Sequence, residues 1–68
     1  MDPEQVRYYT ESIRLCDKLI RQLENDRDGM QRCVKGELLS EYRKSTEKAI
    51  LKVKQVRNAL RAAQSAQQ

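Results

Sequence analysis

Apolar residues recur at alternating intervals of three and four through the N-terminal half of the chain. The positions in this first series are Val6, Tyr9, Ile13, Cys16, Ile20, Leu23, Arg27, Met30 and Val34. Such spacing defines the a and d positions of a heptad repeat, which share one face of an α-helix. Arg27 is either a polar residue that sets pairing specificity or a side chain that extends its aliphatic stem outward. The series predicts a long amphipathic helix.

A second series with the same spacing occupies the C-terminal half. Its positions are Leu39, Tyr42, Thr46, Ala49, Val53, Val56, Leu60 and Ala63, with Ile50 beside them. If the first series continued unbroken, it would next reach Glu37 and Glu41. The phase must therefore reset between the two series, which predicts a second amphipathic helix after a turn.

Capping residues predict where these helices begin and end. Asp2 followed by Pro3 is the order of a helix start, so the first helix is expected over about residues 3–34. Gly36 can adopt the left-handed conformation that commonly ends a helix, which predicts a turn over about 35–37. The second helix then covers about 38–64. The alternative turn lies around Gly29, where the composition of the preceding residues is that of a loop.

The expected fold class is all-α: an antiparallel, coiled-coil-like hairpin of two helices, forming one module over residues 1–68. Two glycines, one proline and no Phe or Trp argue against a β-sandwich or barrel. A short connection makes two helices antiparallel neighbours. With only 38% hydrophobic residues, two helices bury little apolar surface. We therefore expect self-association, most simply as a homodimer, or a partner protein to complete a helical bundle.

The residue inventory argues against an enzyme. The chain has no histidine, the usual general base and commonest metal ligand. Cys16 and Cys33 do not form a C-x-x-C pair, so we expect reduced thiols in an intracellular protein, cytoplasmic rather than nuclear. No apolar run approaches the ~20 residues that span a bilayer. We predict no catalytic residues, no cofactor, no metal and no membrane span.

Positive charge is concentrated in the C-terminal half. Residues 1–34 hold 6 basic and 7 acidic groups, whereas residues 35–68 hold 8 basic and 3 acidic ones. The candidate partner-binding residues there are Lys48, Lys52, Lys54, Arg57 and Arg61. Four interpretations compete: a solvated helix face, a site for an acidic protein surface, a site for nucleic acid, or contact with an anionic membrane surface.

Some side chains outside the two series also indicate contacts. Tyr8 is adjacent to Tyr9 and cannot share its face, so it is either a rim residue or an anchor for a partner. Leu15 and Leu51 likewise lie off the series and hint at a second contact face. Tyr8 and Arg27 are therefore added to the candidate partner-binding residues.

The segment 23–30, followed by a short connection and a second helix of heptad character, resembles the Rho-effector homology-region-one repeat. Helix one of that family carries a basic residue, an acidic residue and a glycine, followed by apolar positions. Arg27-Asp28-Gly29-Met30 and then Cys33 match this order. The resemblance covers roughly residues 13–63. It implies an antiparallel helical hairpin with a site for a Rho-family GTPase on its surface.

These observations favour a non-catalytic interaction or assembly module of a larger intracellular protein, such as an adaptor or a GTPase effector. The alternative is a small basic helical protein that associates with nucleic acid through the cationic residues of the second helix. Salt-dependent retention on DNA or RNA separates the two.

Overall fold

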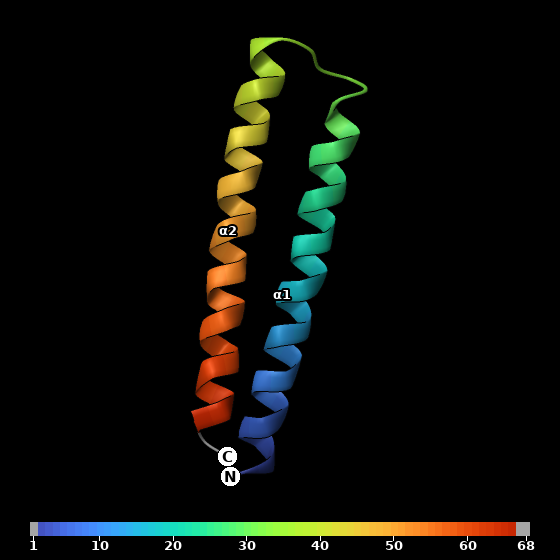
Figure 1. Ribbon diagram of the computed structural model, residues 1–68. Coiled ribbons are helices and arrows are strands. Elements are labelled where there is room, and N and C mark those ends of the chain that lie inside the picture. The colour runs from blue at the N-terminus through green and yellow to red at the C-terminus, as the bar shows by residue number, and fades with distance from the viewer. Residues whose placement is uncertain (1, 67–68) are drawn as a thin grey trace.

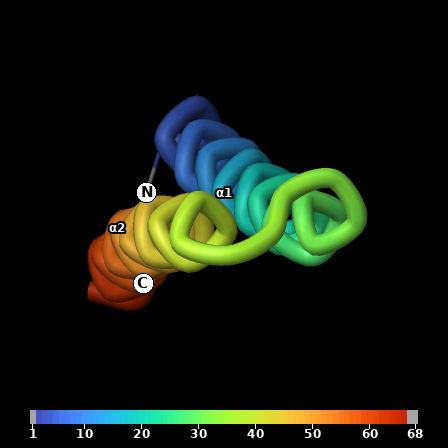
Figure 2. Tube along the Cα trace, turned by 90° about the horizontal axis from the view of Figure 1, so that it is seen from above, coloured from blue at the N-terminus to red at the C-terminus, as the bar shows by residue number. Residues whose placement is uncertain are grey.

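The computed structural model describes residues 2–66, which form two helices and no strand. Helix α1 covers Pro3–Met30 and helix α2 covers Glu37–Ala66. The helices run antiparallel, so the start of α1 lies beside the end of α2 (Figure 1). Seen from the loop end, they form a single layer and are inclined to one another (Figure 2). The all-α hairpin is confirmed; residues 1, 67 and 68 of the expected 1–68 module lie outside the described part.

The first helix begins where the sequence indicates. Asp2 has an extended backbone, and its side-chain oxygen accepts a hydrogen bond from the amide of Glu4 at 3.1 Å. Pro3 occupies the first helical position, where its missing N–H leaves no hydrogen bond unmade. This is the N-cap arrangement that Asp2 and Pro3 predict.

Helix α1 ends at Met30, four residues before the expected end at residue 34. The amide of Arg32 donates to the carbonyl of Gly29, and that of Cys33 to Met30, so the backbone tightens into three-residue turns. Gly29 weakens the last helical turn because glycine has low helix propensity. The apolar spacing continues to Val34, which stays half-buried, but the helix does not. The connection is therefore residues 31–36 rather than 35–37.

Gly36 has the predicted left-handed conformation, with φ at 75°, but a different role. It directly precedes α2, and its carbonyl accepts the first hydrogen bond of that helix, from the amide of Ser40 at 3.2 Å. Because α1 has already ended at Met30, Gly36 caps the start of α2 rather than the end of α1. Gly29, the alternative turn position, lies inside α1.

The two helices bury very little. The buried side chains among residues 2–66 are Ile20 at 5% exposure, Ile50 at 4% and Thr46 at 7%. Half-buried side chains flank them along the contact, namely Tyr9, Ile13, Cys16, Leu23, Met30, Leu39, Tyr42, Ala49, Val53 and Leu60. Neither helix is sufficiently long and apolar to cross a membrane, within the described part of the chain.

Val6 and Val56, both expected to pack in the contact, are exposed. For α2 the reason is a change of phase: the inward-facing positions step by four twice, from Tyr42 to Thr46 to Ile50. An α-helix has 3.6 residues per turn, so a strict heptad pattern drifts away from a straight neighbour, and the extra step of four corrects the drift. Beyond it Arg57 lies at the contact, and Val56 is turned outward with 45% exposure.

Candidate functional site

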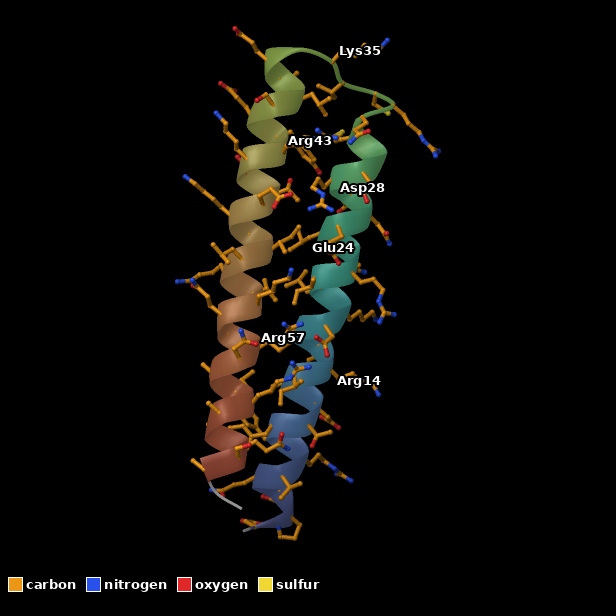
Figure 3. The ribbon with its side chains drawn as sticks, viewed as in Figure 1. Arg14, Glu24, Asp28, Lys35, Arg43 and Arg57 are labelled. Atoms are coloured by element: carbon orange, nitrogen blue, oxygen red, sulfur yellow. The ribbon has the colours of Figure 1, made fainter. Side chains whose placement is uncertain are left out.

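An ion pair joins the two helices in the half of the hairpin that is farther from the loop. Arg57 of α2 donates from Nη1 to Oδ1 of Asp17 on α1 at 3.0 Å, and Arg61 Nη2 lies 3.8 Å from Oδ2 of the same carboxylate. Figure 3 shows Arg57 between the helices, whereas Arg14 extends away from them. The carboxylate of Asp17 therefore reaches across the contact to α2.

A second ion pair lies nearer the loop. Arg27 of α1 donates from Nη1 to Oε1 of Glu47 on α2 at 2.6 Å and from Nε to Oδ1 of Asp28 at 3.2 Å. The hydrogen bond to Glu47 raises the pKa of Arg27 most, and the hydrogen bond to Asp28 raises it further. Two interpretations of Arg27 were open: a polar residue within the contact, or a side chain that extends outward. The structure shows the first, because Arg27 pairs with Glu47 of the opposite helix.

These contacts fix the register of the two helices. In the pairs Arg57–Asp17 and Arg27–Glu47 the two residue numbers add up to 74. A third pair has the same sum: Gln64 Nε2 lies 3.5 Å from Oγ1 of Thr10. Each residue of α1 therefore lies opposite the residue of α2 whose number completes that sum.

The hairpin also has an internal two-fold relationship. Moving thirty positions along the chain takes Asp17 to Glu47 and Arg27 to Arg57, so one ion pair maps onto the other. The same step takes Ile20 to Ile50, the two buried isoleucines. Equivalent residues of the two helices therefore lie on the same side of the hairpin.

One side, which we call the polar face, carries the cross-helix ion pairs. It consists of two rows at helical spacing, which are Thr10, Asp17, Arg21, Glu24 and Asp28 on α1 and Ser40, Glu47, Leu51, Lys54, Asn58 and Arg61 on α2. The placement follows from the contacts, because Asp17 and Glu47 each receive an arginine from the other helix.

The opposite side, which we call the apolar face, is lined by the complementary rows. These are Tyr8, Ser12, Leu15, Leu19, Leu23, Asp26 and Met30 on α1 and Leu38, Tyr42, Ser45, Ala49, Val53, Val56, Leu60 and Ala63 on α2. Within residues 2–66, five of the seven exposed large hydrophobic residues belong to it, namely Tyr8, Leu15, Leu19, Leu38 and Val56. A face of this kind typically marks a protein interaction site.

The structure separates the sequence-predicted site residues into groups. Lys48 and Lys52 are exposed, and Lys54 is half-buried. Three arginines of the set form ion pairs with the opposite helix: Arg27 with Glu47, and Arg57 and Arg61 with Asp17. Asp17 thus supplies the carboxylate that Arg57 and Arg61 lack among their neighbours in the sequence.

Tyr8, the remaining candidate, lies on the apolar face, and its ring packs edge-on against Tyr9 with centroids 5.6 Å apart. The sequence suggested Leu15 and Leu51 as one second contact face, but the structure places Leu51 on the polar face and groups Leu15 with Leu19 and Leu38. The signal that could have found them is the recurrence of apolar residues beside the main series, at the same three-four spacing.

Other features of the described residues do not form a site. No group of three or more Cys, Asp or Glu side chains in residues 2–66 is arranged to hold a metal ion. A surface hollow lined by Pro3, Glu4 and Arg7 lies at the start of α1, away from both ion pairs. No family model matches the sequence, and no curated protein or solved structure shows significant similarity to it.

Proposed function

We propose that the chain is a non-catalytic protein interaction module that assembles with another protein surface through its apolar face. The observation that supports this is the imbalance between what the hairpin buries and what it exposes. In the described part of the chain three side chains are buried, while five large hydrophobic residues are exposed together on one side. Two helices of this size provide a marginal core, and covering the apolar face would complete it. The free thiols Cys16 and Cys33 support an intracellular location.

Site-specific photo-crosslinking tests this function. Leu15 on the apolar face and Leu51 on the polar face have nearly equal exposure, 61% and 58%, and both lie within a helix. A photo-reactive residue at position 15, in cells that produce the chain, is expected to give a discrete protein adduct, whereas position 51 gives none. Equal labelling at both positions, or no adduct at position 15, would contradict the proposal.

The resemblance to Rho-effector hairpins adds a Rho-family GTPase as a proposed partner class. The hairpin fold is the one that the resemblance implies, and two of the matching residues, Arg27 and Asp28, are hydrogen-bonded to each other near the loop. Titration with a Rho-family GTPase loaded with a non-hydrolysable GTP analogue tests this part. Binding that is lost with the GDP-loaded form supports it, and equal or absent binding of the two forms argues against it.

The alternative function, nucleic-acid association, has weaker support. Of the cations on α2 that suggested it, Arg57 and Arg61 pair with Asp17, although Arg61 stays exposed. Lys48 and Lys52 are the exposed members of the set that the cross-helix ion pairs do not engage. Phosphate binding by several cations gives a steep dependence of affinity on salt. Retention on DNA or RNA at low salt that is lost at higher salt would favour this alternative.

A further inference from the structure

The composition of the apolar face matches what an interface between helical layers requires. Asp26 is the one charged residue of its α1 row, and its α2 row, from Leu38 to Ala63, has no charged residue. The large exposed side chains are spread over both helices, from Tyr8 at one end of α1 to Leu38 near the loop. A partner that covers this face must therefore be about as long as the hairpin itself.

The dimensions of the hairpin agree with those of a layer in a helical bundle. Its Cα atoms extend over 51 × 15 × 10 Å, so the molecule is one helix thick. A face of 51 × 15 Å is on the order of the ~800 Å² that each partner buries in a stable interface. A second layer of equal length and width would cover the apolar face and leave the polar face in solvent.

The internal two-fold relationship makes a second copy of the chain a suitable second layer. Because the row from Tyr8 to Met30 and the row from Leu38 to Leu60 are equivalent in position, either row of one copy can lie over either row of another. Two face-to-face arrangements keep all neighbouring helices antiparallel. In one, α1 lies over α2 of the other copy and both loops are at the same end; in the other, each helix lies over its own equivalent and the loops are at opposite ends.

Charge distinguishes these two arrangements. Residues 1–34 have 6 basic and 7 acidic groups, a net charge of −1, while residues 35–68 have 8 and 3, a net charge of +5. Placing α2 over its own equivalent would bring two strongly positive helices together. Placing α1 over α2 of the other copy avoids this and puts the helix with more acidic groups beside the basic one.

We propose that two copies of this chain pack through their apolar faces into a four-helix bundle with both loops at the same end. This inference rests on the proposed interaction function and adds the identity and the orientation of the partner. In the bundle, Leu15 and Leu19 of one copy pack against the α2 row of the other, and the Arg57–Asp17 and Arg27–Glu47 pairs remain on the outer surface.

The first part of the test is the mass in solution of the full chain and of two matched variants. The chain mass is 8.0 kDa, and sedimentation equilibrium is expected to show twice that value for the unmodified chain. Leu15→Glu buries a carboxylate in the proposed interface and should weaken association by roughly 100-fold. Leu51→Glu makes the same change on the polar face and should leave association unchanged. A monomer at all concentrations, or equal weakening by both variants, would overturn the proposal.

The second part measures orientation and needs no charged substitution in the apolar face. Cys33 is exposed in the connection 31–36 and can carry a spin label once Cys16 is replaced by Ser. With both loops at one end, the two labels should be under about 25 Å apart, because neighbouring helices in a bundle are ~10 Å apart. With the loops at opposite ends, the separation would approach the 51 Å length of the hairpin. That longer distance would overturn the proposed orientation.

The two proposals fail in different ways. If the chain is monomeric but position 15 crosslinks to a different protein, the interaction function stands and self-association is wrong. If position 15 gives no adduct of any size, the interaction function itself is contradicted.

Discussion

Arg57 of α2 donates to Asp17 of α1, and the same relationship, repeated through the internal two-fold, joins Arg27 to Glu47. In each pair the arginine extends from the line of contact of one helix to a carboxylate on the polar flank of the other. Sliding one helix by a single turn would separate both pairs at once. The ion pairs therefore select the register of the two helices. In this register Ile20 and Ile50 are buried between the helices.

Asp17→Asn should destabilise the hairpin, because Asp17 is the acceptor for Arg57 and lies close to Arg61. A charge-assisted hydrogen bond at a partly exposed position contributes about 1 kcal/mol to the free energy of unfolding. In a domain of this size, that corresponds to a decrease in Tm of roughly 4–8 °C. Thermal unfolding followed by circular dichroism at a fixed chain concentration measures it. Glu11→Gln, which removes an equal charge from an exposed residue of α1, is the control and should leave Tm nearly unchanged.

Ile50→Ala tests the phase of α2. Ile50 is 4% exposed, so its truncation should lower the free energy of unfolding by about 2–4 kcal/mol through lost burial and the cavity left behind. The neighbouring Leu51→Ala, on the polar face, should cost less than about 0.5 kcal/mol. Chemical denaturation of both variants gives the comparison. A larger effect at Leu51 than at Ile50 would mean that the contact runs along a different line of α2.

The two glycines should respond to alanine with opposite signs. A Cβ added at either Gly29 or Gly36 meets no atom within 4 Å, so backbone conformation alone decides the outcome. Gly36 has a φ of 75°, which alanine adopts at a cost of about 1 kcal/mol, so Gly36→Ala should lower Tm. Gly29 is helical, and Gly29→Ala should add about 0.5 kcal/mol of stability. Destabilisation by Gly29→Ala would show that the chain needs a turn there, as the alternative interpretation held.

The features that the sequence could predict are those that depend on nearby residues. The start of α1 follows from Asp2 and Pro3, and the hairpin follows from two apolar series joined by a short segment. The predicted end of α1 at residue 34 was wrong, because the apolar spacing continues to Val34 although the backbone leaves the helix after Met30. The prediction that Val56 packs in the contact was wrong, because a strict heptad count ignores the drift of a helix with 3.6 residues per turn.

The cross-helix contacts could not be predicted in the same way. Which residue of α1 meets Arg57 depends on the length and path of residues 31–36, and the sequence left that connection undecided between Gly29 and Gly36. An error of one helical turn in the loop would have placed a different side chain opposite Arg57. The grouping of Leu15, Leu19 and Leu38 on one face depends on the same register, so the apolar face emerged only with the fold.

The most direct test of this account is the dependence of Tm and helix content on chain concentration, measured by circular dichroism under reducing conditions. If the apolar face is covered by a second copy, unfolding and dissociation are linked, so Tm should rise with concentration and helix content should fall on dilution. The Leu15→Glu variant should lose this dependence, and Leu51→Glu should keep it. A Tm that is independent of concentration, together with full helix content in a monomer of 8.0 kDa, would contradict the account.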